Sequence, residues 1–330
     1  MSCIFMEEHD SMELKERMRA AITAGITGDA LGVPVESSTR QELSLCSVKN
    51  MLGYGRYDQP TGTWSDDTSM TLCTMESLIR GYDIHDIAQK FCRWLFEGYR
   101  TASGYVFDSG LTTFMALESI TSGQCTALTS GKDSEDDNGN GSLMRILPAA
   151  LYFRNEATET FLARIHEISA ITHAHPRAQI ACGIYSLLVR ALLDEKGKEA
   201  AFQETVSLAL QQYESTEDYK EELRHFMRIL SYEVLTLSSD DIQSSGYVVD
   251  TLETAIWSFF QHDSTRSIVL EAVNLGLDTD TNGMVAGGLA GLAHGLDSIP
   301  DEWLQALAKK DEVTTLIDSF IDTALKQSQS

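Results

Sequence analysis

Residues 279–295 read TDTNGMVAGGLAGLAHG, and from position 283 onward every fourth residue is a glycine. A spacing of four residues places side chains on one face of an α-helix. Glycine weakens a helix by about 1 kcal/mol relative to alanine, so a glycine face needs a packing reason. We therefore predict a central helix here, approached closely by the backbone of another segment along Gly283, Gly287, Gly291 and Gly295.

Helical periodicity continues over most of the remaining chain. Residues 14–26 (LKERMRAAITAGI) repeat apolar or small side chains at steps of three and four, and Pro34 marks the exit from this helix. No segment alternates apolar and polar residues as a half-buried strand does. The sequence therefore predicts an all-α, compact, bundle-like fold, with further helices at residues 68–80, 160–170, 176–193, 221–237, 251–260 and 264–275.

Length and composition indicate one globular unit. The chain has 330 residues, of which 43% are apolar and 22% charged, an ordinary globular composition. The loop-like segments 49–64 and 129–141 are too short to act as flexible linkers, so we expect a single domain over 1–330. The six cysteines include no C-x-x-C pair and are expected to be reduced thiols.

The charge balance excludes several classes of partner. There are 25 Lys and Arg against 49 Asp and Glu, a formal net charge of −24, which repels nucleic-acid phosphates and anionic lipids. The first ten residues lack the cationic flank and apolar run of a signal peptide. The uncharged stretch 281–296 is short and rich in glycine, unlike a membrane-spanning helix. We expect a soluble cytoplasmic protein with no membrane or nucleic-acid partner.

Two short acidic motifs, each at a predicted loop-to-helix junction, carry the main chemical signal. They are WSDDT at 64–68 and DTDT at 278–281. Taken alone, each is explained by helix capping, because Ser, Asp and Thr satisfy the free N–H groups of a first turn. If the two motifs meet in space, their oxygen ligands suit Mg²⁺ or Mn²⁺, with room for two ions.

A glycine-rich segment, GNGS at 139–142, precedes another helical stretch. The exposed N–H groups of such a loop favour an anion such as a phosphate, and a plain turn is the alternative. The pair His173 and His175 lacks nearby cysteine or carboxylate partners, so capping or ligand contact is favoured over zinc.

Six motifs, in order along the chain, resemble those of the ADP-ribosylglycohydrolases, the group that includes the dinitrogenase reductase-activating glycohydrolase. Together they span roughly residues 20 to 295. The motifs are GDALGVPVE (28–36), GTWSDDTSM (62–70), FDSGLTT (107–113), GNGSLMR (139–145), THAHP (172–176) and NLGLDTDT (274–281).

The resemblance implies an all-helical fold with a binuclear Mg²⁺ or Mn²⁺ centre. The metal ligands it implies are Ser65, Asp66, Asp67, Asp278, Asp280 and Thr281. The carboxylates it implies for catalysis are Glu36, Asp108 and Asp67. The residues it implies for binding ADP-ribose, at the diphosphate and adjoining ribose, are Gly139, Asn140, Gly141, Ser142 and His173.

The activity implied is hydrolysis of the bond between the anomeric carbon of ADP-ribose and an acceptor, such as an arginine or serine side chain of a protein. Two alternatives stay open. One is a hydrolase of another ADP-ribose derivative, such as an O-acyl or phosphorylated form. The other is a non-catalytic ADP-ribose-binding or structural protein on the same scaffold, as in the family's crystallin-like members. The intact acidic residues favour an enzyme.

Overall fold

The computed structural model describes residues 2–194 and 196–327 of the chain, and over these residues it is built from helices. Their strand-like pairings are three isolated bridges, so the described chain forms no sheet and the all-α prediction is confirmed. The α-helices are α1 (Ser2–Gly32), α2 (Arg40–Leu45), α3 (Asp66–Leu78), α4 (Ile84–Glu97), α5 (Leu111–Thr121), α6 (Leu147–Tyr152), α7 (Thr158–Ser169), α8 (Pro176–Leu193), α9 (Lys198–Tyr213), α10 (Glu217–Glu222), α11 (Met227–Leu230), α12 (Val248–Gln261), α13 (Thr265–Asn274), α14 (Thr279–His294), α15 (Asp301–Ala306) and α16 (Lys310–Lys326). Short 3₁₀ segments are η1 (Val33–Val35), η2 (Gly55–Tyr57), η3 (Glu135–Asp137), η4 (Leu143–Arg145), η5 (Leu223–Phe226), η6 (Glu233–Thr236), η7 (Ser239–Asp241) and η8 (Leu296–Ser298).

The glycine face predicted for residues 279–295 packs against α1. A Cβ atom added at Gly283, Gly287 or Gly291 would collide with backbone atoms of α1, so glycine is what allows the two helices to touch. Gly295 is the exception: it ends α14 with a φ of +75°, and a Cβ there would meet nothing within 4 Å. The predicted close packing is confirmed for three of the four glycines. Its consequence is that the start of α14 lies against the end of α1.

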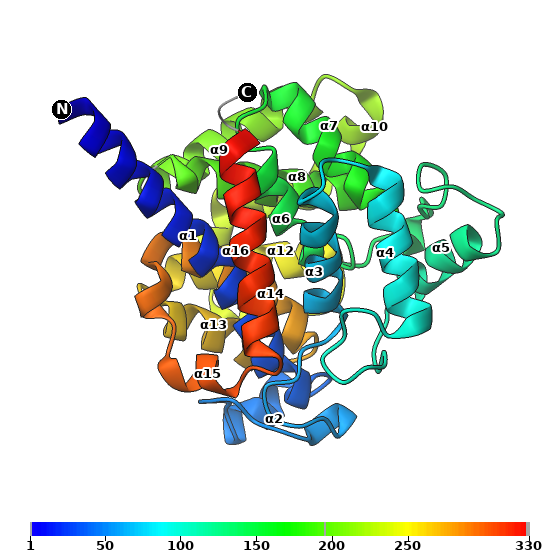
Figure 1. The fold of residues 1–330 in the computed structure, drawn as a ribbon, viewed down its shortest axis with the longest axis vertical. Coiled ribbons are helices and arrows are strands. Elements are labelled where there is room, and N and C mark those ends of the chain that lie inside the picture. The colour runs from blue at the N-terminus through cyan, green and yellow to red at the C-terminus, as the bar shows by residue number, and fades with distance from the viewer. Residues whose placement is uncertain (1, 195, 328–330) are drawn as a thin grey trace.

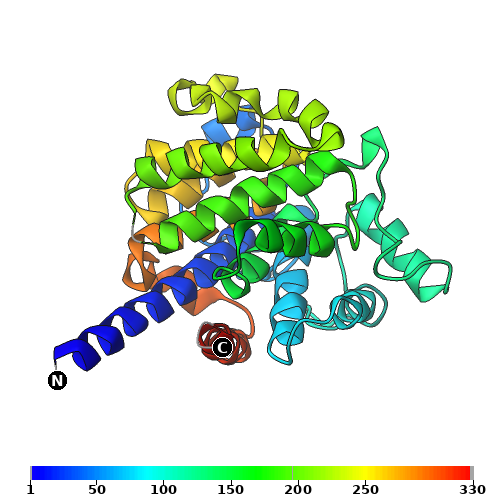
Figure 2. The same cartoon turned by 90° about the horizontal axis from the view of Figure 1, so that it is seen from above.

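The other helices surround this central pair. Helices α8, α12 and α13 pack on α14, and the C-terminal helix α16 packs on α1 and α3. Figure 1 shows α16 on the near side of the bundle, with α4 and α5 at the edge far from the N-terminus. Figure 2 shows α16 end-on beside α1. The first and last helices of the chain therefore pack together in the same bundle.

Most predicted helices agree with the structure to within a few residues, and α8 has the predicted bounds. The prediction of one helix over 221–237 is wrong, because that segment is divided among α10, η5, α11 and η6. Its buried side chains recur every three or four residues, a spacing that 3₁₀ turns satisfy as well as an α-helix does. Tyr232, with a φ of +66°, then interrupts the helical backbone.

Two further expectations can be compared with the structure. Among the described helices, none combines the length and the apolar character needed to cross a membrane. Cys46, Cys73, Cys92, Cys125 and Cys182 are free thiols, as expected, and the side chain of Cys3 lies outside the described residues.

Candidate functional site

The first acidic motif is held in place by a carboxylate from α1. Asp29 is fully buried and accepts hydrogen bonds from the backbone N–H groups of Ser65 and Thr68, each at 3.0 Å. It also accepts from the hydroxyl groups of Ser65 (2.9 Å) and Thr68 (2.5 Å). Ser65 caps α3 as well, because its Oγ accepts from the N–H of Asp67 at 3.3 Å. Capping and site formation therefore coexist in this motif.

The two acidic motifs meet, although 214 positions separate the residues that touch. The Thr281 hydroxyl donates to Asp67 Oδ2 at 3.4 Å, and Ser65 Oγ lies 3.2 Å from the same oxygen. Asp280 is buried beside them, and the charge of Asp67 contributes to raising its pKa. The close packing of α14 on α1 creates this meeting, since it brings the start of α14 to the residues that Asp29 organises.

The second motif also reaches the glycine-rich loop. Asp278 precedes α14 but makes no side-chain cap, so the capping explanation does not account for its carboxylate. Instead Asp278 Oδ2 accepts a hydrogen bond from Asn140 Nδ2 at 2.7 Å. The same nitrogen donates to Thr251 Oγ1 at 2.8 Å. The Asn140 side chain therefore links the loop to the acidic motif.

Three carboxylates from distant segments form the open side of the site. Oxygen atoms of Glu36, Asp108 and Asp280 lie within 4.8 Å of one another. The Tyr57 hydroxyl can donate its one hydrogen to Glu36 or to Asp108, and the centroid of the Tyr57 ring lies 5.0 Å from that of Phe107. One phenol therefore serves two of the three carboxylates.

The backbone next to Glu36 is tied to the turn before α14. The N–H of Ser37 donates to the carbonyl of Leu277, and the N–H of Leu277 donates to the carbonyl of Ser38, each at 2.7 Å. Ser37 and Leu277 both adopt left-handed backbone conformations, with φ of +65° and +62°. This reciprocal pairing explains why Glu36 reaches Asp280.

Burial and mutual repulsion raise the pKa of several of these carboxyl groups. The pKa values of Asp66, Asp67 and Asp280 lie well above the usual range, first because of burial and then because of neighbouring carboxylates. Burial also raises the pKa of Asp29 to about 6, despite its hydrogen bonds from Thr68 and Ser65. For Glu36, burial and the charges of Asp108 and Asp278 outweigh the Tyr57 hydrogen bond and raise the pKa to about 7. Such a concentration of acid groups favours a cation.

The donor set fits a hard divalent cation. Asp67 Oδ1 and Glu36 Oε2 are buried without a hydrogen-bond partner. Among the described residues, no Lys or Arg forms an ion pair with any of these carboxylates. Buried carboxylates are normally paired or bound to metal, and all-oxygen sites suit Mg²⁺ or Mn²⁺. The residues that could hold the ions are Ser65, Asp66, Asp67, Asp278, Asp280 and Thr281.

The glycine-rich loop is anchored to the segment before α12. Gly139 pairs with Tyr247 in an isolated bridge, and the N–H of Asn140 donates to the carbonyl of Gly246 at 3.0 Å. Asp278 lies on the other side of Gly246, where an added Cβ would come within 3.0 Å of its carboxylate. The loop and the acidic motif are thus supported by one segment.

Gly141 lies directly against His173. A Cβ at Gly141 would come within 2.8 Å of His173 Cε1 and 3.0 Å of Thr113 Oγ1. His173 is buried, and burial, with the charge of Arg145, lowers its pKa to about 3. Its Nδ1 lies 2.8 Å from Thr172 Oγ1, which accepts from Arg145 at 2.7 Å. The Thr172 hydroxyl is then free to donate to Nδ1, which leaves the proton of neutral His173 on Nε2.

The Ser142 side chain has a different setting. It is fully buried, and its Oγ accepts a hydrogen bond from Ser169 Oγ at 2.8 Å and lies 3.4 Å from Cys182 Sγ. Its hydroxyl is therefore engaged within the core, behind the loop.

Two residues of this site were missed in the sequence. Asp29 lies in the GDALGVPVE motif. It could have been identified as a carboxylate on the buried face of the first helix, because it follows Gly25 by four residues and so shares its face. Tyr57 lies in the 49–64 loop, where no periodicity marks it.

The chain is similar to known proteins over most of its length. The sequence model of the ADP-ribosylglycohydrolase family matches residues 10–329. The chain is 31% identical over 316 residues to ADP-ribosylarginine hydrolase Tri1 of Serratia proteamaculans, covering 93% of this chain and 80% of that protein. It is 32% identical over 319 residues to ADP-ribosyl-[dinitrogen reductase] glycohydrolase of Rhodospirillum rubrum, covering 94% and 97%. A solved structure titled ADP-ribosylglycohydrolase-related protein complex superimposes with a TM-score of 0.78 at 29% identity, covering 95% of this chain and 99% of that one.

Proposed function

This chain belongs to the ADP-ribosylglycohydrolase family and is an ADP-ribosyl hydrolase, and from that premise we propose that it removes ADP-ribose from arginine side chains of proteins with the help of two Mg²⁺ or Mn²⁺ ions. The choice of arginine rests on the relative named ADP-ribosylarginine hydrolase. The observation that carries the metal part is the meeting of two acidic motifs whose buried carboxylates form no ion pair with any Lys or Arg in the described part of the chain.

Six residues would hold the ions, namely Ser65, Asp66, Asp67, Asp278, Asp280 and Thr281. When bound, the ions supply Lewis acidity toward oxygen atoms of the ribose and of water, and they offset the charge of the diphosphate. Asn140 keeps the Asp278 carboxylate oriented, and Asp29 keeps the Ser65 turn in place. These two are positioning residues, since they act through the ligands they hold.

Glu36 and Asp108 are the groups proposed to move protons. A pKa of about 7 lets the Glu36 carboxyl give or take a proton near neutrality, and its Oε2 is buried without a partner. The Tyr57 hydroxyl is a hydrogen-bond donor within reach of both carboxylates. Asp67, with its own unpartnered Oδ1, shares the negative surroundings that would stabilise an oxocarbenium-like transition state.

The loop Gly139–Ser142 and His173 are proposed to bind the phosphate end of ADP-ribose. The neutral His173 offers a donor at Nε2, close to Gly139 and Gly141, while the loop offers backbone N–H groups. We predict that Gly141→Leu abolishes detectable ADP-ribose binding in calorimetry, because the new side chain displaces His173. Gly197→Ala is the matched control, since a Cβ there meets only Glu199, at 4.0 Å. Unchanged affinity of Gly141→Leu would refute the placement.

The acceptor is tested with a panel of substrates. ADP-ribosylarginine, a serine-linked ADP-ribosyl peptide and an O-acyl-ADP-ribose are assayed with Mg²⁺, with Mn²⁺ and in chelator. We expect turnover of the arginine linkage, lost in chelator and restored by the divalent ion. Turnover of the O-acyl ester alone, or binding of ADP-ribose with no turnover of any substrate, would support the alternatives instead.

A further inference from the structure

Helix α5 presents an apolar surface to solvent. Leu111, Phe114 and Met115 are 73%, 38% and 45% exposed, and their spacing places them on one face of the helix. Phe96 at the end of α4 is 47% exposed, and the centroid of its ring lies 6.4 Å from the centroid of the Phe114 ring. These four residues are called the α5 face below. Single exposed apolar residues are normal, but a group of four on adjoining helices marks an interaction surface.

The opposite side of α5 contacts the candidate site. A Cβ added at Gly141 would lie 3.0 Å from Thr113 Oγ1, so α5 borders the glycine-rich loop Gly139–Ser142. The Thr112 hydroxyl donates to Asp137, in the same loop segment, at 3.2 Å. Asp108, one of the proposed proton-transfer groups, lies three residues before Leu111. The α5 face therefore continues outward from the edge of the site.

The arrangement in space leaves this face accessible. Figure 1 shows α4 and α5 at the outer edge of the bundle, away from the central helices α1 and α14. The buried residues of α5, which include Ala116 and Leu117, already supply its contact with the core. The exposed apolar side chains are thus not needed to attach the helix.

We propose that the α5 face docks the ADP-ribosylated protein substrate, through an apolar patch on that protein next to the modified side chain. This inference rests on the proposed function. A glycosidic bond attached to a folded protein can reach Glu36 and Asp108 only if the surface of that protein comes to the rim of the site. The α5 face lies on that rim.

Charge distinguishes this occupant from a second copy of the chain. The exposed acidic residues around the face include Glu97, Glu118 and Asp136, on a protein of net charge −24. A self-complementary contact would bring these acidic rims together, which is unfavourable. A partner with an apolar centre and basic residues around it complements the surface.

The test compares a large and a small substrate of the same linkage. The variant combines Leu111→Ser, Phe114→Ser and Met115→Ser. The substrates are a folded basic protein carrying one arginine-linked ADP-ribose and free ADP-ribosylarginine. We expect kcat/KM for the protein to fall at least tenfold, mainly through KM, while kcat/KM for ADP-ribosylarginine stays within twofold. Met227→Ser, which changes a 54% exposed residue on α11, is the matched control and should alter neither value.

If the parent is active, three results would overturn the proposal. An equal loss for both substrates would show that α5 acts on the site itself, and no loss for the protein substrate would show that the face does not dock it. Self-association of the parent that disappears in the variant, measured by light scattering, would assign the face to a second copy. A parent that hydrolyses neither substrate contradicts the proposed function. The docking proposal then depends on binding of the modified protein, and equal affinity of parent and variant would overturn it.

Discussion

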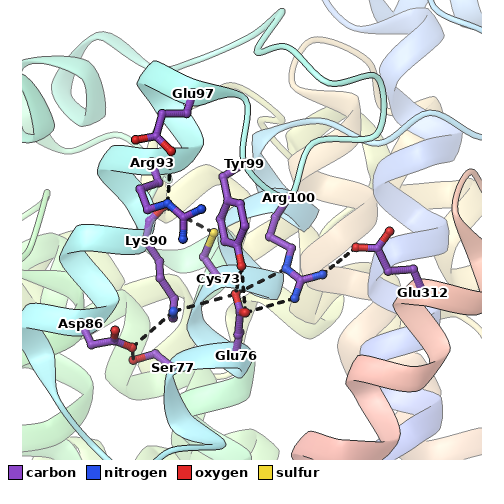
Figure 3. A network of polar contacts seen from close by, with 10 residues as sticks. All are labelled: Cys73, Glu76, Ser77, Asp86, Lys90, Arg93, Glu97, Tyr99, Arg100 and Glu312. Carbon is purple, nitrogen blue, oxygen red and sulfur yellow. Dashed lines mark hydrogen bonds and ion pairs between the residues drawn. The ribbon is translucent and has the colours of Figure 1, made fainter.

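Helix α3 carries carboxylates in two opposite electrostatic settings. Glu76, in its second half, is surrounded by cations and donors (Figure 3): Arg100 lies 3.2 Å away, Lys90 lies 3.9 Å away, and the Tyr99 hydroxyl donates to it at 2.7 Å. Burial acts to raise the pKa of Glu76, but the hydrogen bonds and charges of these neighbours hold it below the usual range. Asp67, in the first turn of the same helix, has a pKa well above the usual range.

The difference is one of charge balance: residues of the described chain neutralise Glu76, but they do not neutralise the acidic centre. The charge on Glu76 is balanced by residues of the chain itself, so this network needs nothing more. The acidic centre gathers Asp66, Asp67 and Asp280 without a cation and leaves a buried oxygen of Asp67 unpartnered. Such an arrangement opposes folding unless an external cation is bound, so it is kept for a function rather than for stability.

The largest effect expected is on turnover, from Asp280→Asn. Asparagine preserves the shape and the helix-start hydrogen bonding but removes an anionic ligand. We expect hydrolysis of ADP-ribosylarginine to fall at least about a thousandfold, or about 4 kcal/mol of transition-state stabilisation, with Mn²⁺ content reduced. The fold should be retained, and the metal-free variant should be at least as stable as the parent, because it lacks a carboxyl group whose charged form is disfavoured by burial and by neighbouring carboxylates. Turnover, metal content and circular dichroism check this, and full activity of the variant or of chelated parent would contradict it.

Glu76→Gln should have the opposite effect, lowering the stability of the fold without lowering turnover. It leaves Lys90 and Arg100 partly buried with one partner fewer, although Asp86 and Glu312 still contact them. We expect a loss of about 2–3 kcal/mol in the free energy of unfolding, measured in urea. Turnover per folded molecule should be unchanged. A loss of activity without a loss of stability would mean that the network serves the site.

The free energy of unfolding should depend on pH through the raised pKa of Glu36 in the acidic centre. With its pKa raised to about 7, Glu36 keeps a proton in the folded state that the unfolded chain releases near its ordinary value of 4.5. Its contribution to stability is therefore complete below about pH 4.5 and is lost as the pH rises toward 7.

Glu36→Gln isolates this term, because buried His173 and His166, whose lowered pKa values act in the opposite direction, are common to both proteins. In chelator, the variant should gain stability relative to the parent between about pH 5 and 7.5, by an amount on the order of 3 kcal/mol. Thermal unfolding across this range measures it. A difference that does not change with pH would show that Glu36 is charged throughout.

The smallest effect is expected at the rim of the Glu76 network. Glu312 pairs with Arg100 at 2.6 Å, but its side chain is 55% exposed. Exposed pairs contribute little, so Glu312→Gln should lower the free energy of unfolding by less than about 1 kcal/mol and leave turnover unchanged. A loss as large as that of Glu76→Gln would show that position 312 completes the charge balance of the network.

Local sequence patterns were enough to predict the all-α class and the close packing along three of the four glycines, and they single out the short motifs proposed to carry the chemistry. These features depend on local periods and residue types. One local pattern misled, at 221–237, because 3₁₀ turns and α-helices share nearly the same spacing of buried residues. The family resemblance supplied the ADP-ribosyl hydrolase class, which the comparisons confirm.

Tertiary structure alone decided how the motifs combine. The contact of Thr281 with Asp67 exists because the glycine face lets α14 lie directly on α1, and no local rule relates positions 214 residues apart. The roles of Asp29 and Tyr57 depend on the same packing, since each acts on residues from another segment. Burial then set the pKa values, because the free energy of a charged carboxylate depends on the solvent and charges around it. A sequence contains the carboxylates, but only the folded chain brings them together away from water and from its own cations.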